Sequence, residues 1–341
     1  MHPIAFTYPE GHQAHHQPGH AERPERIEAL QAALQAAGYW ARGSLLSPIE
    51  LDPSVLTAIH TPHLLASLPE YAQHHRPFDE DTYLNPASWP LALRTAGAAA
   101  ALAAAVWRRE AAGGLALTRP PGHHATPERA MGFCILNNIA LAAQHLLQHQ
   151  GAQRLAIIDL DVHHGNGTQD IFYEREDVLF ISSHQIPLYP GSGSLDERGR
   201  GPGDGFTVNL PLPPGSGDAA FRVAYDEIVP SLLDRFQPEM LLVSLGLDAH
   251  WQDPLAELRV SAAGYGAAVH SLQRWASQHC GGRIALILEG GYDLDGLAAS
   301  SLCAVQALLG EEIRDPLGPG PDPENDGWLP VFDQVRRLWN L

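Results

Sequence analysis

The stretch LAIIDLDVHHG at residues 155–165 joins a short apolar run to a cluster of carboxylates and imidazoles. Such a run, bounded by polar residues, predicts a buried β-strand. The same join recurs as ALTRPPGHH at 116–124, LLVSLGLDAH at 241–250 and IALILEGGY at 284–292. Helix-like segments separate these runs, so the pattern predicts parallel strands whose polar ends meet at one edge of a sheet. An open α/β sheet builds its active site at that edge.

Helical periodicity and caps predict helices on both faces of this sheet. The predicted strands are 115–118, 155–162, 178–184, 240–248 and 283–291. The predicted helices are 23–38, 86–112, 137–151, 219–235, 261–279 and 296–309. Residues 187–214, rich in glycine and proline, predict a long functional loop without regular structure. We therefore expect one α/β domain over 1–341, with three α/β/α layers around a mostly parallel sheet, a core at about 19–310 and a C-terminal extension at about 311–341.

The composition argues against some classes of partner. Of 341 residues, 45% are hydrophobic and 18% are charged, as is usual for a folded globular protein. The formal net charge of −18, from 21 basic and 39 acidic side chains, would repel nucleic acid and anionic lipid. We therefore expect neither nucleic acid nor a membrane as a direct partner, whereas a cationic ligand would meet a favourable field. The simpler interpretation, which we favour, is that the acidity only aids solubility.

The cysteines and the N-terminus indicate the compartment. Cys134, Cys280 and Cys303 show no C-x-x-C spacing, and their odd number predicts neither a disulfide framework nor a cysteine zinc site. The first residues, MHPIAFTYPEGH, lack the pattern of a signal peptide, so we expect a reducing, cytoplasmic setting. As a helix, the alanine-rich stretch 95–107 would span about 20 Å against a hydrocarbon thickness of about 30 Å, so we expect it in the protein core.

Asp161 and His163 are candidate metal ligands because they alternate with apolar residues at the end of the strand predicted at 155–162. Alternate residues of an extended chain share a face, with neighbours on that face about 7 Å apart at Cα. Asp161 and His163 could therefore share one ion, whereas Asp159 would lie about 13 Å from His163 and is expected behind the ligands. Asp248 ends another apolar strand and is the candidate third ligand, because a buried carboxylate is costly without a compensating charge.

Two carboxylates and one imidazole would balance a divalent cation and leave an open position for water, as in catalytic zinc sites. We expect Zn²⁺, with Fe²⁺ as the alternative metal. Taken singly, each of these residues would more often be a cap or a satisfied polar group. The segment with His12, His15, His16 and His20 lacks an apolar frame and is expected at the rim of the site rather than on a metal.

His123 and His124 follow a Pro-Pro-Gly turn that would aim both rings at the sheet edge. The unperturbed pKa of histidine suits general acid–base work near neutrality, and Asp159 and Asn166 could orient the two rings. Tyr292 follows two glycines, which let the backbone bend and could direct the phenol to a developing oxyanion. A tyrosine that only caps the sheet is the alternative interpretation.

The ordered set of motifs resembles the histone deacetylase and acetylpolyamine amidohydrolase family, which has the arginase–deacetylase fold. The similarity runs from GHAERPERI near residue 19 to about residue 310. Its motifs are PPGHH (120–124), GFCILNN (132–138), DLDVHHGNGTQ (159–169), SSH (182–184), LYPGSG (188–193), LDAHWQDPL (247–255) and LEGGY (288–292). Any one motif could arise by chance, but the ordered set is highly specific, and it is similar to a class II-like, bacterial-type member.

The resemblance implies a role for each matching residue. The metal ligands of the family fall on Asp161, His163 and Asp248. Its general base, partner imidazole and carbonyl-polarising tyrosine fall on His124, His123 and Tyr292. The narrow tunnel for the acylated chain would be lined by Gly132, Phe133 and Tyr189. A structural K⁺ would be held through Asp159, Asp161, His163, Ser182 and Ser183.

Some positions depart from part of the family. Asn166 stands where one subgroup has an aspartate behind the general base, which resembles the class II branch. Leu247 replaces a phenylalanine that is common before the ligand aspartate. Leu255 occupies a position at the rim of the tunnel where a polyamine-selective relative carries glutamate, so the resemblance favours the lysine deacetylases. The acidic residues at 79–81 could contact the substrate backbone or amine at the rim.

The resemblance implies a zinc-dependent amidohydrolase that removes acetyl or other acyl groups from lysine side chains in proteins or peptides. The alternatives are a deacetylase of acetylpolyamines or other small N-acylamines, and a non-catalytic protein that binds an acyl ligand. A two-metal ureohydrolase of related fold would need more bridging carboxylates than these motifs offer. The sequence predicts no particular oligomeric state.

Overall fold

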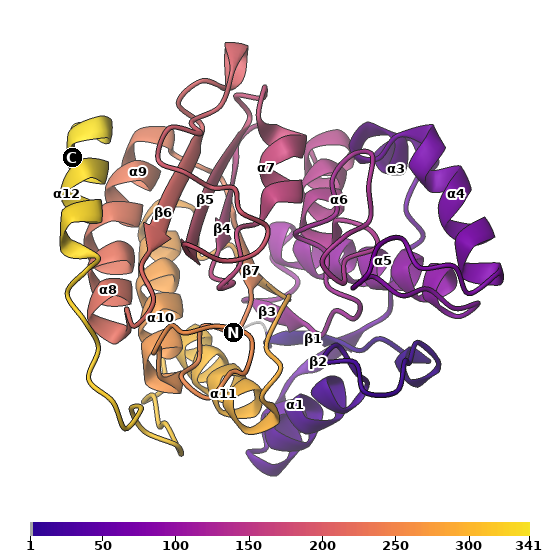
Figure 1. Cartoon of the computed structure of the whole chain (residues 1–341), viewed down its shortest axis with the longest axis horizontal. Coiled ribbons are helices and arrows are strands. Elements are labelled where there is room, and N and C mark those ends of the chain that lie inside the picture. The colour runs from indigo at the N-terminus through magenta and orange to yellow at the C-terminus, as the bar shows by residue number, and fades with distance from the viewer. Residues whose placement is uncertain (1–2) are drawn as a thin grey trace.

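A central sheet of eight parallel strands organises the fold (Figure 1). The computed structural model describes residues 3–341. The strands are β1 (Ala5–Thr7), β2 (Ser44–Leu46), β3 (Gly114–Ala116), β4 (Leu155–Asp159), β5 (Val178–Gln185), β6 (Thr207–Leu212), β7 (Leu241–Leu245) and β8 (Ile284–Leu288). They lie in the order β2-β1-β3-β8-β7-β4-β5-β6, and every neighbouring pair is parallel. The carboxyl ends of all strands therefore lie at one edge of the sheet.

Helices cover both faces of the sheet. The larger helices are α1 (Glu25–Ala36), α3 (Pro53–Ile59), α4 (Pro62–Gln73), α5 (Ser88–Trp107), α6 (Asn138–His145), α7 (Asn166–Phe172), α8 (Asp218–Val223), α9 (Val229–Phe236), α10 (Ala262–His279), α11 (Leu294–Leu309) and α12 (Leu329–Trp339). The short helical segments are the α-helix α2 (Tyr39–Arg42), the 3-10 helices η1 (His12–Ala14) and η3 (Gly201–Gly203), and the π-helices η2 (Leu146–Gln150) and η4 (Ala224–Ile228). In Figure 1, α1 and α8 to α12 lie on one side of the sheet and α3 to α7 on the other. This confirms the predicted three-layer α/β/α class.

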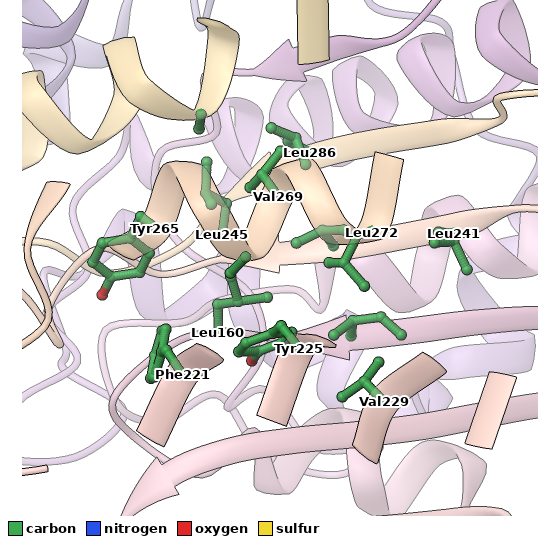
Figure 2. Close-up of a cluster of buried hydrophobic side chains, with 14 of the residues drawn as sticks. Leu160, Phe221, Tyr225, Val229, Leu241, Leu245, Tyr265, Val269, Leu272 and Leu286 are labelled. Atoms are coloured by element: carbon green, nitrogen blue, oxygen red, sulfur yellow. The ribbon is translucent and has the colours of Figure 1, made fainter. Parts of the chain in front are cut away.

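The hydrophobic core falls into two large clusters, one on each face of the sheet. Figure 2 shows part of the first cluster, where Val269 and Leu272 of α10 lie beside Leu245 of β7 and Leu286 of β8. All four side chains are fully buried. Burial of one such side chain contributes about 1.5–3 kcal/mol relative to leaving it exposed. The strands are thus held firmly from both faces, which gives the sheet edge a fixed geometry.

Helix α5 lies at the centre of the second core cluster. By length and composition it could cross a membrane, but 78% of its most apolar window is buried inside the protein. It packs against α6 and the strands below it. This confirms the expectation that 95–107 belongs to a core helix.

The predicted strands are present, and several are shorter than expected. The strand predicted at 155–162 ends at Asp159, and the expectation of an extended chain through His163 is wrong. The reason is that side chains, rather than a neighbouring strand, accept the N–H groups of residues 161–163. Asp159 Oδ1 accepts the N–H of Asp161 at 3.1 Å, and Asp161 Oδ1 accepts the N–H of His163 at 2.9 Å. The chain therefore turns, and this turn brings His163 back over Asp161.

The prediction of a loop without regular structure over 187–214 is wrong in part. Residues Thr207–Leu212 form β6, which pairs with β5 at the edge of the sheet, and Gly201–Gly203 form η3. Strand β6 contains Pro211, which lacks an N–H donor, and an edge position tolerates this loss. Residues 187–200 form neither helix nor strand. The C-terminal helix α12 packs beside β6.

Candidate active site

Four neighbouring strands bring the predicted polar clusters together. Strands β3, β8, β7 and β4 are consecutive in the sheet. The carboxyl end of β3 leads to His123 and His124, and that of β8 leads to Tyr292. The carboxyl end of β7 leads to Asp248, and that of β4 leads to the turn at 161–163. Groups that are far apart in the chain therefore meet at one place, as the sequence predicts.

Asp161, His163 and Asp248 each offer a donor atom within 4.8 Å of the other two. The Nδ1 atom of His163 lies 3.1 Å from Asp161 Oδ1 and 3.3 Å from Asp248 Oδ2. Two bonds of about 2 Å to one tetrahedral ion place their donor atoms about 3.3 Å apart. The three residues therefore fit a single ion the size of Zn²⁺.

The charges of this cluster also favour a cation. Within residues 3–341, the buried Oδ2 atom of Asp248 has no hydrogen-bond partner, and its nearest cationic group is His163, whose Nδ1 lies 3.3 Å away. Burial and the adjacent Asp161 raise the pKa of Asp248. Burial lowers the pKa of His163, but the carboxylates of Asp161 and Asp248 outweigh it and raise that pKa to about 10. A proton on His163 thus supplies the positive charge that a divalent cation would replace.

A second buried cluster could also hold a metal. His123, Cys134 and Glu289 place donor atoms within 4.8 Å of one another. Burial raises the pKa of the Cys134 thiol well above its usual value and that of Glu289 to about 8. Both groups therefore favour the protonated form, whereas a metal binds the thiolate and the carboxylate. The cluster of Asp161, His163 and Asp248 is the better cation site.

The two adjacent histidines have different hydrogen-bond partners. His123 Nδ1 lies 3.1 Å from Asp159 Oδ2, and His124 Nδ1 lies 2.7 Å from Asn166 Oδ1. Because an amide oxygen only accepts, the Nδ1 of His124 is assigned as the donor, which leaves its Nε2 able to accept a proton. Asp159 and Asn166 thus orient the two rings.

The surroundings push the pKa values of these histidines apart. Burial lowers the pKa of His123, but the charges of Asp161 and Asp159 outweigh it and raise that pKa to about 10. Burial, together with His123 and His163, holds the pKa of His124 well below its usual value. Neighbouring titratable groups with separated pKa values are typical of acid–base sites. His124 is therefore neutral and able to act as a base, while His123 carries a positive charge.

Tyr292 is directed into the same site by the turn after β8. Gly291 has a φ of 118°, a backbone conformation that favours glycine. A Cβ atom at Gly290 would lie 2.0 Å from Asp248 Oδ2, so a larger residue would displace the carboxylate. Burial raises the pKa of Tyr292 well above its usual value. The phenol therefore keeps its proton and can donate a hydrogen bond.

A cavity of about 190 Å³ leads to these groups, and it is lined by Asp81, His124, Gly132, Phe133, His163, Leu188, Tyr189, Leu255 and Tyr292. Two aromatic rings form its walls. Phe133 meets Tyr292 edge-on with ring centres 5.6 Å apart, and Tyr189 meets His124 edge-on at 5.1 Å. A Cβ atom at Gly132 would lie 2.5 Å from His124 Cδ2, so glycine keeps the slot open. A slot of this kind suits an extended aliphatic chain.

The remaining residues of the predicted site occupy several places. Ser182 lies in β5 and pairs in register with Asp159. The Ser183 hydroxyl lies 3.4 Å from the Asp159 carbonyl oxygen. Of the acidic residues at 79–81, Asp81 lines the cavity.

The histidine-rich segment is divided between the rim and the protein interior. His20 packs edge-on against Phe133 with ring centres 4.7 Å apart, so it lies beside the cavity wall. His12 and His15 are buried, and the expectation that they lie at the rim is wrong. The reason is that both belong to a buried network, in which His15 Nδ1 lies 2.7 Å from the Ser88 hydroxyl.

Comparison with protein families identifies the class of enzyme. Residues 20–308 match the family model described as the histone deacetylase domain. The chain belongs to the histone deacetylase family. It is therefore a hydrolase of the deacetylase type.

Relatives and a solved structure agree with this family assignment. A probable deacetylase of Archaeoglobus fulgidus is 40% identical over 305 residues, which cover 88% of this chain and 85% of the relative. The histone deacetylase-like amidohydrolase of Pseudomonas aeruginosa is 38% identical over 303 residues, which cover 88% of this chain and 80% of the relative. The crystal structure of the HDA15 HD domain matches with a TM-score of 0.90 at 34% identity, covering 99% of this chain and 94% of that one.

This histone deacetylase family member also has a buried arginine, Arg26, to which the sequence motifs assign no role. Arg26 of α1 donates from Nε to the carbonyl oxygen of Gly291 and from Nη2 to that of Glu289, both at 2.6 Å. Its guanidinium carbon lies 4.9 Å from the centre of the Tyr292 ring. Arg26 therefore holds the turn that carries Tyr292. A signal exists in the sequence, since Arg26 lies one helical turn before Leu30 on the apolar face of α1.

Replacing Arg26 by leucine is expected to lower the free energy of unfolding by about 3–6 kcal/mol. Each lost hydrogen bond to a charged group costs about 1.5–3 kcal/mol, and Arg26→Leu leaves two carbonyl groups without their donor. Denaturant titration of the two proteins measures the difference. As a control, Arg314→Leu removes an exposed ion pair with Glu312 and is expected to leave the free energy of unfolding nearly unchanged. Equal effects of the two substitutions would contradict the role of Arg26.

Proposed function

We propose that this protein is a zinc-dependent amidohydrolase that removes acetyl or other acyl groups from lysine side chains in proteins or peptides. One observation carries the proposal. The donor atoms of Asp161, His163 and Asp248 converge beside a narrow cavity whose lining includes a neutral imidazole and a protonated phenol. Membership of the histone deacetylase family supports the same chemistry.

The proposed reaction divides the work among the residues of the site. Asp161, His163 and Asp248 would hold Zn²⁺, which when bound polarises the acyl carbonyl and acidifies water. His124 takes a proton from the attacking water at Nε2 and returns it to the leaving amine. His123 stays charged and stabilises negative charge nearby, and Tyr292 donates its phenol hydrogen to the oxyanion. The products are the free carboxylate and the amine.

The shape of the cavity favours a lysine side chain as the part that enters. Phe133 and Tyr189 line the cavity, so their aromatic surface can contact the methylene groups of the substrate. Leu255 adds an apolar wall. Asp81 also lines the cavity and could accept a hydrogen bond from a peptide N–H. An apolar slot with an acceptor in its lining suits an acylated lysine within a peptide.

Acetylpolyamines and other small N-acylamines are the second candidate substrates. The observation that favours them is the carboxylate of Asp81 in the cavity lining, in a chain with a formal net charge of −18. A carboxylate there would attract the distal ammonium group of a polyamine. Leu255 argues against a polyamine substrate, because it places an apolar side chain in the cavity lining.

Two further parts of the proposal rest on the sequence alone. The resemblance to the family implies a structural K⁺ held through Asp159, Asp161, His163, Ser182 and Ser183. The three cysteines without C-x-x-C spacing favour a reducing, cytoplasmic setting, and the formal net charge of −18 argues against nucleic acid or a membrane as a direct partner. Elemental analysis of the purified protein for potassium would test the first of these.

Turnover of an acetyl-lysine peptide, a longer acyl-lysine peptide and acetylspermidine by the zinc-loaded protein tests the proposed substrate. We expect kcat/KM for the acetyl-lysine peptide to exceed that for acetylspermidine by about tenfold or more, because Leu255 offers no partner to an ammonium group. Leu255→Glu is the matched variant, and it is expected to shift the preference toward acetylspermidine. A wild-type preference for acetylspermidine would contradict the lysine assignment and favour the second candidate.

A further inference from the structure

Asp253 joins the turn that carries Tyr292 to the wall of the cavity. Its Oδ2 atom accepts the N–H group of Tyr292 at 2.7 Å and that of Asp293 at 3.3 Å. Its Oδ1 atom accepts the N–H group of Leu255 at 3.0 Å. Because Tyr292 and Leu255 both line the cavity, a single carboxylate connects two of its walls.

We propose that Asp253 is a positioning residue that sets the place of the Tyr292 phenol and the width of the acyl slot at Leu255. The inference rests on the proposed function, because it gives Asp253 a part in amide hydrolysis and in the choice of acyl group. Asp253 does not itself line the cavity. It therefore acts through Tyr292 and Leu255 rather than on the substrate.

The turn before Tyr292 needs support because its own backbone is unusually free. Glycine loses more conformational freedom on folding than any other residue, and two glycines precede Tyr292. Asp161 Oδ2 accepts the N–H of Gly290 at 2.9 Å, and Arg26 donates to the carbonyl oxygen of Gly291. Asp253 completes this support by binding the N–H of Tyr292 itself. The hydrogen bond from Asp253 fixes the backbone of Tyr292 directly, and this limits the movement of its phenol.

Burial strengthens these contacts. Asp253 is 6% exposed, so water competes little for its oxygens. Burial and the charge of Asp248 raise the pKa of Asp253 to about 7, and the three N–H donors oppose this shift by favouring the carboxylate. Hydrogen bonds that a carboxylate accepts are shorter and stronger than those between neutral groups. The hydrogen bonds of Asp253 therefore hold both the turn at Tyr292 and the backbone at Leu255 in place.

A carboxylate can accept on both of its oxygens, and an amide cannot. In Asp253→Asn, we expect the amide oxygen to stay with the two donors at Tyr292 and Asp293. The amide NH₂ would then face the N–H of Leu255, and these two donors repel. Asp253→Asn therefore releases the wall at Leu255, whereas Asp253→Ala releases both segments. The two substitutions separate the effect on slot width from the effect on the phenol.

Kinetics with acyl-lysine peptides of different length tests the proposal. In Asp253→Asn, the ratio of kcat/KM for hexanoyl-lysine to that for acetyl-lysine is expected to rise about fivefold, mainly through KM, which corresponds to about 1 kcal/mol of lost restraint. In Asp253→Ala, kcat for the acetyl-lysine peptide is expected to fall about 10- to 100-fold, because a misplacement of about 1 Å can cost about 100-fold.

Asp218→Asn is a matched control for the loss of a loop-holding carboxylate. Asp218 accepts the N–H of Ser261 at 2.8 Å and its hydroxyl at 2.7 Å, and it does not line the cavity. We expect Asp218→Asn to lose stability and to keep the wild-type kcat and acyl-length ratio. If the Asp253 variants behave in the same way, Asp253 is only structural and the proposal is overturned.

Hydrogen exchange of backbone amides provides a readout that does not depend on activity. Faster exchange at 253–257 in both Asp253 variants, and at 289–293 in Asp253→Ala alone, is the expected result. If the zinc-loaded wild type hydrolyses none of the acyl substrates, the proposed function fails. The exchange pattern alone then tests whether Asp253 holds the two segments. Unchanged exchange at both segments would then overturn the role of Asp253.

Discussion

Replacing Tyr292 by phenylalanine is expected to lower kcat for an acetyl-lysine peptide by about 100-fold or more. The substitution removes one hydrogen-bond donor to the oxyanion, and such a loss costs about 100- to 1,000-fold in other hydrolases. The aromatic ring remains, so its contacts with Phe133 and with the guanidinium of Arg26 are kept. Steady-state kinetics of the two zinc-loaded proteins measures the effect.

Two measurements show whether the Tyr292→Phe effect belongs to the phenol. Metal content should be unchanged, because the substitution leaves the three proposed ligands Asp161, His163 and Asp248 in place. KM should change little, because the phenol acts on charge that develops during the reaction. Near-unchanged turnover in this variant would show that Tyr292 only caps the sheet.

Replacing Asp248 by asparagine is expected to remove bound metal and to abolish detectable turnover. Asp248 Oδ1 accepts the N–H of Val162 at 2.9 Å, and an amide oxygen can keep that bond. The change therefore acts mainly on Oδ2, the buried atom that has no hydrogen-bond partner within the described residues 3–341. Elemental analysis should fall from about one zinc per chain to about one tenth of that or less, because an amide lacks the charge of a carboxylate ligand.

The metal-free proteins supply the control for Asp248→Asn. Without a metal, burial and Asp161 disfavour the charge on Asp248, as its raised pKa shows. A group whose folded pKa is raised destabilises the fold when it is ionised, so the neutral amide should not lower stability. We therefore expect metal-free Asp248→Asn to unfold at or above the denaturant midpoint of the metal-free wild type. Full zinc occupancy in Asp248→Asn would contradict its assignment as a ligand.

The fold and the place of the polar clusters could be predicted because one pattern repeats. Each cluster follows a short apolar run, and parallel strands bring such ends to one edge. The adjacency of β3, β8, β7 and β4 could not be predicted, because strand order depends on tertiary packing that no local pattern records. Strand β6 was missed for a local reason, because Pro211 and the flanking glycines are typical of a loop.

The residues that support Tyr292 show where prediction from sequence reaches its limit. Arg26 and Asp253 reach the turn at 289–293 from α1 and from the loop after β7. Their partners are backbone groups, which every sequence contains, so no residue pairing in the sequence points to these contacts. The turn at Asp161 and His163 escaped prediction for a related reason. Side chains there cap the N–H groups that an extended strand would offer to its neighbour.

The position of the metal is the most direct test of the proposed site. An anomalous difference map, recorded at the zinc absorption edge from crystals of the zinc-loaded protein, would locate the ion without reference to activity. We predict one peak about 2 Å from His163 Nδ1 and from a carboxylate oxygen of both Asp161 and Asp248. A peak at His123, Cys134 and Glu289 instead, or no peak near either cluster, would contradict the account.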